Sequence, residues 1–246
     1  MLKGSKALVT GASRGIGYAI AKILAKNNCS VVITGRNKNT LNEAAKTIEG
    51  NVTPMVWDAA DISLSTRELE EAANIMGGLD IVVNNAGLFA QRSEWSKESL
   101  LSTTIDEWDI VMKVNTSAIF FTMQAAVNYM LKNNIRGNIL NVASVAGYEP
   151  AYGAYGASKT AVNNLTRGWG KMFAEDGITI NGIAPGPVAT EMNNWHEGDS
   201  MKNHRIPFGR YSTIDEIASL AMYLLSKDAE MVCGETVVLD GAYAIR

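Results

Sequence analysis

Short apolar runs alternate along the chain with longer amphipathic stretches. Each run is nearly continuous and rich in β-branched residues, as expected for a strand that is buried on both faces. The predicted strands are residues 7–9, 31–33, 52–57, 81–83, 139–142, 178–183 and 237–239. The amphipathic stretches predict helices over residues 15–26, 39–48, 66–76, 106–131, 152–173 and 213–225.

This alternation predicts an α/β fold, in which about seven parallel strands form one doubly wound sheet with helices on both faces. No repeat, linker or break in composition divides the chain, so residues 1–246 are expected to form one domain. Thr213 and Glu216 form a predicted capping box at the start of the last helix. The longest stretch without an element, residues 186–211, is rich in Asn, His, Glu and Asp. We name it the flap and expect it to be partly mobile and functional.

The composition limits what the protein binds and where it works. Hydrophobic residues make up 47% and charged residues 19% of the 246 residues, the profile of a soluble globular enzyme. The net charge is −3 and the 22 Lys and Arg residues are scattered, which argues against a nucleic-acid partner. The N-terminus lacks the apolar region of a signal peptide, and no apolar run approaches the roughly 18 residues that span a bilayer. We therefore expect no membrane partner and a cytoplasmic location.

The two cysteines show no pattern of a redox pair or a metal site. Cys29 and Cys233 form no CxxC pair, and no His/Cys cluster has the spacing of a metal site. Two reduced thiols in a cytosolic protein are expected, with no bound metal.

Three glycines follow the first predicted strand and open the first predicted helix. Gly11, Gly15 and Gly17 are spaced Gly-x-x-x-Gly-x-Gly. In a Rossmann-type dinucleotide site, such glycines allow a sharp turn, a close approach of backbone to a pyrophosphate, and tight packing of the new helix. The helix N-terminus adds unpaired N–H groups and a positive dipole end. A glycine-rich turn without a ligand is the alternative, but the position between strand and helix favours a dinucleotide.

Four motifs, in order, resemble those of the short-chain dehydrogenase/reductase family, and in particular its 3-oxoacyl-carrier-protein-reductase-like branch. Residues 10–17 resemble the family's TGxxxGIG, residues 84–87 its NNAG, residues 155–159 its YxxxK, and residues 181–188 its N-x-I-x-P-G-x-V segment. Each motif alone is a weak signal, whereas four at suitable spacing over nearly the whole chain are strong evidence. The resemblance implies an oxidoreductase that moves a hydride between nicotinamide and a small carbonyl or alcohol substrate.

The residues after the second predicted strand favour NADP(H) as the cofactor. An NAD site of this type has an acidic residue there that accepts from the ribose hydroxyl, whereas this chain has Gly35 and Arg36. Arg36 is a fork-shaped donor suited to a 2′-phosphate, and Arg14 in the glycine loop adds a second positive charge. By resemblance, basic residues at both positions mark NADP-preferring members of the family. The alternative is that both arginines are ordinary surface charges.

The resemblance extends the cofactor site to further residues. It places residues 58–59 near the adenine, where Asp61 is a competitor and a solvated loop aspartate is the alternative. It places residues 85–87 along the adenosine side, and Val188 and Thr190 at the nicotinamide carboxamide. The full predicted set is Gly11, Ser13, Arg14, Gly15, Ile16, Gly17, Arg36, Asp58, Ala59, Asn85, Ala86, Gly87, Tyr155, Lys159, Pro185, Gly186, Val188 and Thr190.

Tyr155 and Lys159 are the predicted proton-transfer pair. They are four residues apart on a predicted helix, so their side chains share a face. A free phenol has a pKa near about 10, and a nearby ammonium stabilises the phenolate, so we expect Lys159 to lower the pKa of Tyr155. Tyr152 is the rival tyrosine; it has no lysine one turn along and is expected to line the substrate pocket. A chance pair on a helix surface is the alternative, which the other motifs disfavour.

Ser144 and Asn115 complete the predicted catalytic set. Ser144 ends the fifth strand, and the carboxyl ends of parallel strands face the ligand crevice, so its hydroxyl can contact the substrate oxygen. Asn115 lies within the longest predicted helix; by resemblance it bends that helix and holds a water that relays protons to Lys159, and a surface asparagine is the alternative. The loop from Ser144 to Tyr155 is slightly shorter than is usual in the family, so its substrate wall is expected to be unusual.

The substrate and the assembly rest on weaker signals. Flap residues 193–197 are polar with one aromatic, Trp195, which suits a sugar or polyol and equally a solvated flap over a 3-oxoacyl thioester. An NAD-dependent dehydrogenase of sugars, polyols or other secondary alcohols is the alternative function. A non-catalytic nucleotide-binding scaffold is disfavoured because all four predicted catalytic residues are present. By analogy with many relatives we expect a homotetramer that pairs the last strands and two long helices; the last strand resembles the family's, with Ala242 where a second glycine is usual.

Overall fold

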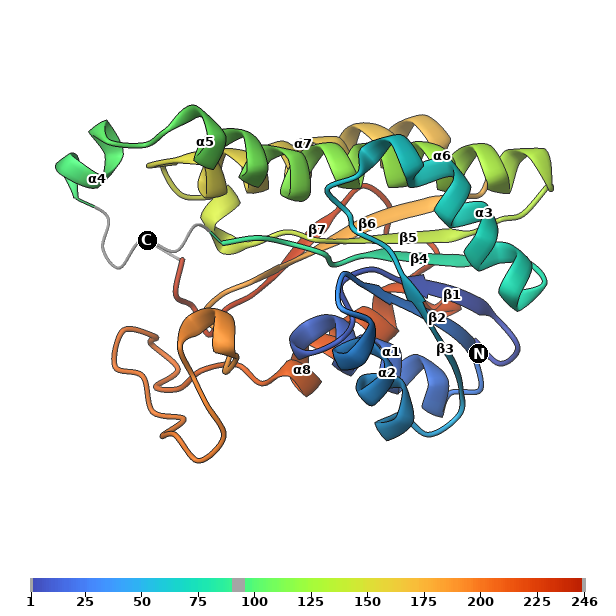
Figure 1. Cartoon of the computed structure of the whole chain (residues 1–246), viewed down its shortest axis with the longest axis horizontal. Coiled ribbons are helices and arrows are strands. Elements are labelled where there is room, and N and C mark those ends of the chain that lie inside the picture. The colour runs from blue at the N-terminus through green and yellow to red at the C-terminus, as the bar shows by residue number, and fades with distance from the viewer. Residues whose placement is uncertain (1, 90–95, 245–246) are drawn as a thin grey trace.

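Seven strands form one parallel sheet in the computed structural model, which describes residues 2–89 and 96–244 (Figure 1). The strand order is β3-β2-β1-β4-β5-β6-β7, and every neighbouring pair is parallel. The seven predicted strands are confirmed as β1 (Lys6–Val9), β2 (Ser30–Gly35), β3 (Asn51–Val56), β4 (Ile81–Asn84), β5 (Asn138–Val142), β6 (Thr179–Pro185) and β7 (Thr236–Leu239). The predicted doubly wound α/β fold is therefore confirmed.

The sheet has its topological switch point between β1 and β4. The chain moves outward from β1 through β2 to β3, returns to the centre at β4, and continues outward through β5, β6 and β7. Ala7 in β1 pairs with Val31 on one side and with Ile81 on the other. A ligand crevice is expected at the carboxyl ends of β1 and β4, where the connections diverge to opposite faces.

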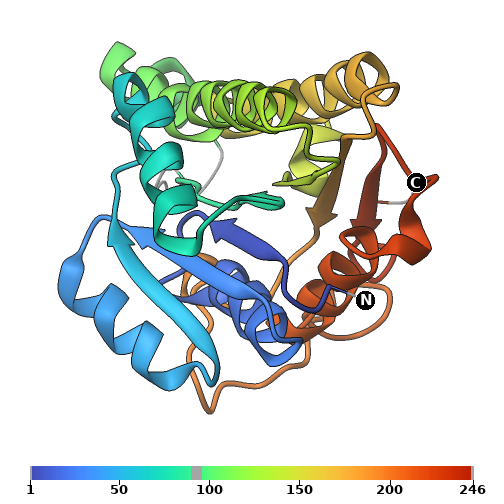
Figure 2. The same cartoon turned by 90° about the vertical axis from the view of Figure 1, so that its right-hand side faces the viewer.

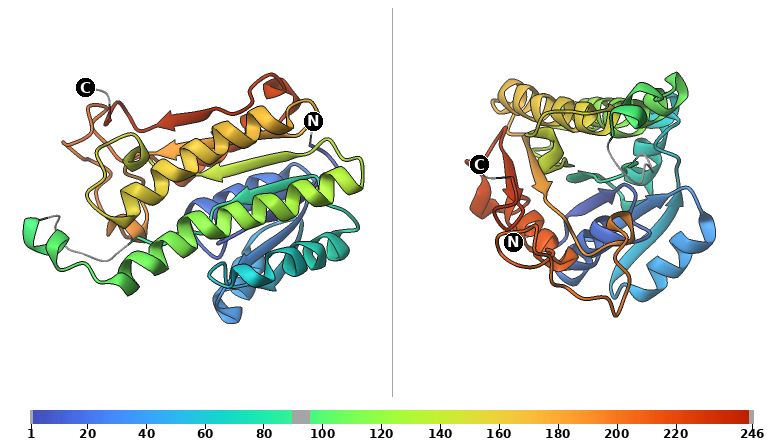
Figure 3. Two further views of the ribbon diagram at one scale, coloured as in Figure 1. Left: turned by 90° about the horizontal axis from the view of Figure 1, so that it is seen from above. Right: turned by 90° about the vertical axis from the view of Figure 1, so that its left-hand side faces the viewer.

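Helices cover both faces of the sheet (Figure 2). One face carries α1 (Gly15–Lys26), α2 (Lys38–Thr47) and α8 (Ile214–Leu224), and the other carries α3 (Ser65–Met76), α6 (Ala118–Lys132) and α7 (Ala154–Phe173). Seen from above, α6 and α7 run side by side across the sheet (Figure 3). Each face has its own hydrophobic core because side chains along a strand alternate between the faces. In β1, Ala7 and Val9 pack on the α1 side and Leu8 packs on the α3 side.

The helix predicted over residues 106–131 contains an irregular turn. α5 (Ile105–Met112) leads into a π-helical turn, η2 (Lys113–Ser117), and then into α6. The combined helix Ile105–Lys132 is long and apolar enough to cross a membrane by length and composition, although polar residues interrupt its apolar stretches. Half of its apolar window is buried inside the fold, where the helix packs against α3 and α7, so it serves as a core helix here.

Smaller elements depart from the predicted pattern. The short helix α4 (Lys97–Leu101) was not predicted, and it is capped by Ser96. α7 begins at Ala154, so Tyr152 precedes the helix instead of lying in its first turn. Ala242 has φ +69°, a left-handed conformation that suits the glycine usual at this position in the family. The 3₁₀ turns are η1 (Ile62–Leu64), η3 (Val145–Gly147), η4 (Glu191–Asn193) and η5 (Lys227–Ala229).

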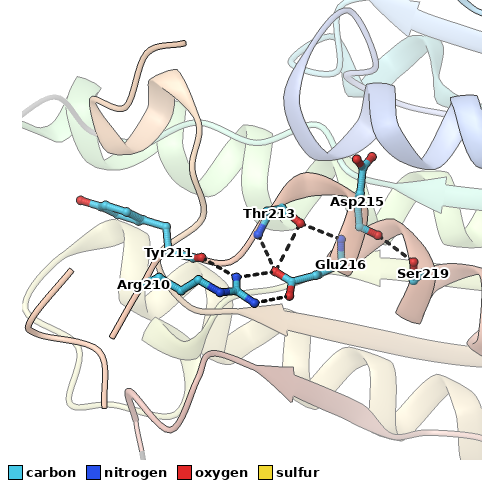
Figure 4. Close-up of polar contacts among 6 residues, drawn as sticks. All are labelled: Arg210, Tyr211, Thr213, Asp215, Glu216 and Ser219. Atoms are coloured by element: carbon cyan, nitrogen blue, oxygen red, sulfur yellow. Dashed lines mark hydrogen bonds and ion pairs between the residues drawn. The ribbon is translucent and has the colours of Figure 1, made fainter. Parts of the chain in front are cut away.

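The two ends of the flap meet beside the start of α8. Val188 and Ser212 form an isolated parallel bridge. The predicted capping box is confirmed, because the Thr213 hydroxyl accepts from the Glu216 N–H (3.1 Å) and the Glu216 carboxylate accepts from the Thr213 N–H (2.8 Å) (Figure 4). Arg210 donates to both oxygens of the same carboxylate, at 2.9 and 2.7 Å. The end of the flap is therefore anchored to α8.

Candidate active site

The carboxyl ends of four neighbouring strands gather most of the predicted site residues. The glycine loop follows β1, residues 85–89 follow β4, Ser144 lies beyond β5, and the flap begins after β6. The flap and α4 both lie at this end of the sheet (Figure 1). Because parallel strands end at a common edge, segments that are far apart in the sequence meet here.

Thr10 joins the glycine loop to the segment after β4. Its hydroxyl oxygen accepts hydrogen bonds from the N–H groups of Asn85 (3.0 Å) and Ala86 (3.1 Å). In return, Asn85 Nδ2 donates to the carbonyl oxygens of Thr10 and Gly11, at 2.9 Å each. Thr10 is absent from the predicted site set, although a hydroxyl at the first position of the glycine motif was a signal for it.

The three glycines of the loop have different surroundings. A Cβ atom at Gly11 would lie 2.7 Å from the Ala86 Cα, and one at Gly17 would lie 2.8 Å from the Gly11 carbonyl oxygen, so the protein itself fills both positions. Gly15 has φ +61°, and its missing Cβ meets only the Thr190 Cγ2, at 3.9 Å. Gly15 therefore presents bare backbone, as the close approach of a pyrophosphate requires.

The N-terminus of α1 has no side-chain cap among the described residues, and its first turn contains no acidic residue. Arg14 is the N-cap residue, and Ile16 in the first turn packs against the core beneath. The N–H groups of the first turn are thus available to an anion, and the helix dipole favours negative charge there. These residues fit the pyrophosphate of a dinucleotide, which could approach the bare backbone of Gly15.

The end of β2 lies beside the glycine loop. Ala12 N–H donates to the Thr34 carbonyl at 2.9 Å, and the Ser13 Oγ would lie 3.9 Å from a Cβ at Gly35. Arg36 follows and is exposed. Arg14 differs from Arg36, because its Nη1 lies 2.7 Å from the Glu191 Oε2 and the guanidinium is held toward the flap.

Asp58 and Ala59 follow β3 at the same edge. The Asp58 carboxylate accepts from the Ala60 N–H at 3.0 Å, and the Asp61 carboxylate accepts from the Ser63 hydroxyl at 2.6 Å. Both aspartates are exposed and both stabilise local turns, so these contacts do not show which of the two lies nearer a bound adenine. The adenine contact assigned to Asp58 stays a prediction.

Tyr155 lies in the first turn of α7, with its ring against Phe89 and its hydroxyl against Ser144. The rings of Tyr155 and Phe89 form a T-shaped pair with centroids 4.8 Å apart. Burial raises the pKa of Tyr155 above its ordinary value, and the hydrogen bond with Ser144 partly offsets that rise. Ser144 is only 9% exposed, and Tyr155 is half-buried beside it.

Lys159 is almost fully buried behind Tyr155. Its Nζ atom donates to the Val142 carbonyl oxygen at 2.8 Å and lies 5.8 Å from the centroid of the Tyr155 ring. Burial lowers the pKa of Lys159 to about 8, because a buried ammonium loses its hydration. The expectation that Lys159 lowers the pKa of Tyr155 is therefore corrected: burial dominates both groups, so the phenol pKa rises while the ammonium pKa falls.

Asn115 is fully buried in the π-helical turn and links three segments. Its Oδ1 accepts from the Leu88 N–H (2.7 Å), while its Nδ2 donates to the Leu88 carbonyl (2.9 Å) and to the Ser158 Oγ (3.1 Å). The Ser158 hydroxyl in turn donates to the Tyr155 carbonyl at 2.6 Å. The surface-asparagine alternative is thus wrong. Ser158 was not predicted as a site residue, and its place inside the YxxxK motif was the one signal for it.

The segment after β6 closes the site on another side. Pro185 is the last residue of β6, and a Cβ at Gly186 would lie 2.5 Å from the Asp240 Cβ, which explains the glycine. Val188 is buried, and its carbonyl accepts from Asn193 Nδ2 at 2.9 Å. The Thr190 methyl group lies beside Gly15, so the start of the flap lies next to the glycine loop.

Within residues 2–89 and 96–244, no group of three or more His, Cys, Asp and Glu side chains could hold a metal ion. Cys29 and Cys233 are both free thiols. Cys29 is buried, and burial raises the pKa of its thiol.

The chain is similar to known enzymes along nearly its whole length. The protein family described as enoyl-(acyl carrier protein) reductase matches residues 11–244. Gluconate 5-dehydrogenase of Gluconobacter oxydans is 35% identical over 255 residues, which cover 99% of this chain and 96% of that protein. A 3-oxoacyl-(acyl-carrier-protein) reductase of Thermotoga maritima is 32% identical over 252 residues, which cover 99% of each protein.

Solved structures agree with the fold. A variant of a Serratia marcescens short-chain dehydrogenase/reductase superposes with a TM-score of 0.87 at 31% identity, covering 99% of each chain. A variant of actinorhodin polyketide ketoreductase, solved with NADPH, superposes with a TM-score of 0.89 at 25% identity, covering 99% of this chain and 98% of that one.

Proposed function

Because the chain belongs to the short-chain dehydrogenase/reductase family and is thus an oxidoreductase, we propose that it uses NADP(H) to reduce a ketone or aldehyde to an alcohol, or catalyses the reverse. The observation that carries this proposal is one cluster of side chains. The Tyr155 hydroxyl is hydrogen-bonded to Ser144, and Lys159 and Asn115 lie behind it. This cluster lies at the edge of the sheet where Gly15 exposes its backbone.

Tyr155 is the proposed general acid. Its raised pKa keeps the phenol protonated at neutral pH, so it can donate a proton to the substrate oxygen during reduction. The Ser144 Oγ accepts from the Ala146 N–H at 3.2 Å, which leaves its own proton for the substrate oxygen or for Tyr155. Bound NADP(H) supplies or accepts the hydride.

Lys159 is proposed to act from behind Tyr155. With a pKa of about 8 it is mostly charged at neutral pH, so it can donate hydrogen bonds to a bound cofactor while it keeps its bond to the Val142 carbonyl. Its Nζ would lie 3.8 Å from a Cβ at Gly87, which fits the predicted contact with the cofactor. Asn115 and Ser158 are proposed to hold the helix that carries both residues. The water relay from Asn115 to Lys159 stays a prediction.

The preference for NADP(H) is supported by the residues at the end of β2. Gly35 offers no carboxylate to a ribose hydroxyl, and the exposed Arg36 provides a guanidinium fork for a 2′-phosphate. The loop residue Ser13 lies next to Gly35, so the glycine loop reaches the same place. The similarity to a ketoreductase solved with NADPH points the same way.

The names of the relatives favour two substrate classes. One relative is a gluconate 5-dehydrogenase, which favours a sugar acid or polyol, and the other is a 3-oxoacyl reductase, which favours an acyl thioester. An NAD-dependent dehydrogenase of sugars or polyols is the second candidate function. A panel of carbonyl substrates with NADPH and NADH, followed at the nicotinamide absorbance band, separates these possibilities.

A homotetramer is proposed on two exposed apolar surfaces. A hollow of about 630 Å³ on the outer side of α6 and α7 is lined by Phe120, Phe121, Leu165 and Trp169. β7 is an edge strand, and its Val238 is 42% exposed. Exposed apolar patches and open sheet edges are typical of interfaces. Sedimentation should give a tetramer at micromolar concentration that truncation before Glu235 dissociates, and a stable, active monomer would refute the proposal.

A cytoplasmic location is proposed as well, supported by the burial of helix Ile105–Lys132 in the fold.

The cofactor preference has a direct test. A charged hydrogen bond contributes about 1.5–3 kcal/mol, so Arg36→Ala should lower the affinity for NADPH by about 10- to 100-fold. Adding Gly35→Asp should shift the preference toward NADH. Arg136→Ala is the matched control, because Arg136 is exposed and pairs with Glu230 instead of belonging to the predicted cofactor set. If Arg36→Ala binds NADPH like the control, the assignment of the 2′-phosphate to Arg36 is wrong.

A further inference from the structure

The ion pair between Arg14 and Glu191 joins the glycine loop to the first turn of the flap. The Nη1 and Oε2 atoms are 2.7 Å apart, and the two side chains are 76% and 59% exposed. Arg14 is the N-cap of α1, and Glu191 begins η4 directly after Thr190. A carboxylate therefore sits beside the helix end that would receive the anionic part of a dinucleotide.

The turn that carries Glu191 is held by hydrogen bonds within the flap, and it lies beside the glycine loop. The Trp195 N–H donates to the Thr190 carbonyl at 3.1 Å, and Asn193 Nδ2 donates to the Val188 carbonyl at 2.9 Å. The Thr190 methyl group is the neighbour of the bare Gly15 backbone. The backbones of Arg14 and Glu191 are thus held near each other, whatever the two side chains do. The pair itself is exposed, so exchanging one partner for another has a small free-energy cost.

We propose that Glu191 sets the cofactor discrimination by acting through Arg14: it holds the guanidinium until the 2′-phosphate of NADP(H) takes the place of its carboxylate. This inference rests on the proposed use of NADP(H). A phosphate monoester carries more charge than a carboxylate and fits the guanidinium fork, so it is the stronger partner. Part of the binding free energy of the 2′-phosphate is then used to break the existing pair. Glu191 therefore weakens the binding of NADP(H) and has little effect on NAD(H), which has no 2′-phosphate.

The test is a double-mutant cycle on cofactor binding, measured by fluorescence titration of NADPH and NADH without any substrate. Glu191→Gln keeps the shape of the side chain and removes its charge. It should bind NADPH about three- to fivefold more tightly, the scale of an exposed ion pair. Its affinity for NADH should change by less than about 1.5-fold. In an Arg14→Ala background, Glu191→Gln should leave the NADPH affinity unchanged. Glu197→Gln, an exposed flap carboxylate, is the matched control and should resemble the unmodified protein.

Three outcomes would overturn the inference. NADPH binding of Glu191→Gln could be unchanged or weaker; NADH binding could tighten as much as NADPH binding; or the gain could persist without Arg14, which would make Glu191 a general source of repulsion. The failure of the underlying proposal is distinguishable. If Arg14→Ala and Arg36→Ala both bind NADPH normally, the proposed preference for NADP(H) fails together with this inference. If both bind NADPH weakly while Glu191→Gln is unchanged, only the role of Glu191 fails.

Discussion

The Lys159 ammonium donates a hydrogen bond to the Val142 carbonyl oxygen, 2.8 Å away, although only 4% of the lysine is exposed. Burial alone accounts for the lowering of its pKa to about 8. The fold therefore holds a charged group at a position where charge is disfavoured, beside the phenol of Tyr155. Such a position is expected for a group kept for its chemistry instead of for stability.

Replacing Lys159 by Met should raise stability at pH 7 while removing activity. A pKa lowered from 10.5 to about 8 corresponds to a folding penalty on the order of 3 kcal/mol, reduced by the loss of the bond to Val142. Because the folded-state pKa is lowered, the unfolded chain binds more protons between pH 8 and 10.5, so the original protein gains stability as pH rises through that window. Urea unfolding at both ends of the window should show the variant's advantage shrinking. A variant less stable than the original protein at pH 7 would contradict this account.

Ser144→Ala should move the pH profile of alcohol oxidation upward as well as slow turnover. The hydrogen bond from Ser144 lowers the pKa of Tyr155 against the rise that burial causes. Oxidation needs the phenolate as a base, so kcat/KM rises with pH toward the pKa of Tyr155. Removing Ser144 should shift that rise to higher pH. If the rate instead falls by one common factor at every pH, Ser144 contacts the substrate without tuning Tyr155.

Asn115→Ala should destabilise the fold by about 1–3 kcal/mol, because it leaves the half-buried Leu88 N–H and carbonyl without their partner. It should also lower kcat, since the chain from Asn115 through Ser158 to the Tyr155 carbonyl is broken. Asn133→Ala is the matched control: this exposed amide bonds only to the Tyr129 carbonyl, at the end of α6, among the described residues. Urea unfolding and steady-state kinetics check both effects. Equal stability of the two variants would refute the linking role of Asn115.

Arg210→Met should weaken the fold at neutral pH and not in acid. The hydrogen bond from Arg210 is the main cause that lowers the pKa of Glu216 to about 2 (Figure 4). A lowered carboxyl pKa contributes stability above its ordinary value of 4.5, and this contribution is lost as pH falls toward 2. The side chains are 37% and 40% exposed, so screening limits the effect to about 1 kcal/mol. Thermal unfolding at neutral and acidic pH should show a difference in stability that closes in acid. The Arg210 guanidinium also lies over the Phe208 ring, 5.2 Å from its centroid, and a constant difference would mean that Arg210 acts through this packing.

The strands and the glycine loop were predictable because their signals are local. A parallel strand that is buried on both faces must be apolar along its length. The run at residues 139–142 therefore predicts β5 even when its neighbouring strands are unknown. The spacing of the glycines at positions 11, 15 and 17 is likewise a local signal, although the need for Gly11 comes from its packing against Ala86 in another segment. The helix over residues 106–131 was predicted too, but its membrane-like apolar character was not, because its apolar positions are spread over a long stretch and not placed in one run.

The features that the sequence could not predict depend on tertiary contacts. The π-helical turn at Asn115 is paired with Leu88 and Ser158, which lie in other segments. The rise in the Tyr155 pKa comes from burial, and no spacing rule reports how deeply a residue four positions from a lysine will be buried. The partner of Arg14 is Glu191, which is distant in the chain and meets it only because β1 and β6 end at the same edge.

Tyr155, and not its neighbour Tyr152, is the residue proposed to deliver the proton. Tyr152 precedes α7 and is 61% exposed, whereas Tyr155 is bonded to Ser144 and backed by Lys159. The most direct measurement compares the turnover of Tyr155→Phe and Tyr152→Phe on one carbonyl substrate, with NADPH affinity measured by fluorescence titration. General acid catalysis is worth about 10²- to 10⁴-fold, so Tyr155→Phe should lose nearly all turnover with NADPH affinity near that of the original protein. Tyr152→Phe should keep its turnover and change mainly the substrate KM. A Tyr155→Phe variant that keeps more than a few per cent of turnover, or an inactive Tyr152→Phe, would show that Tyr155 is not the proton donor.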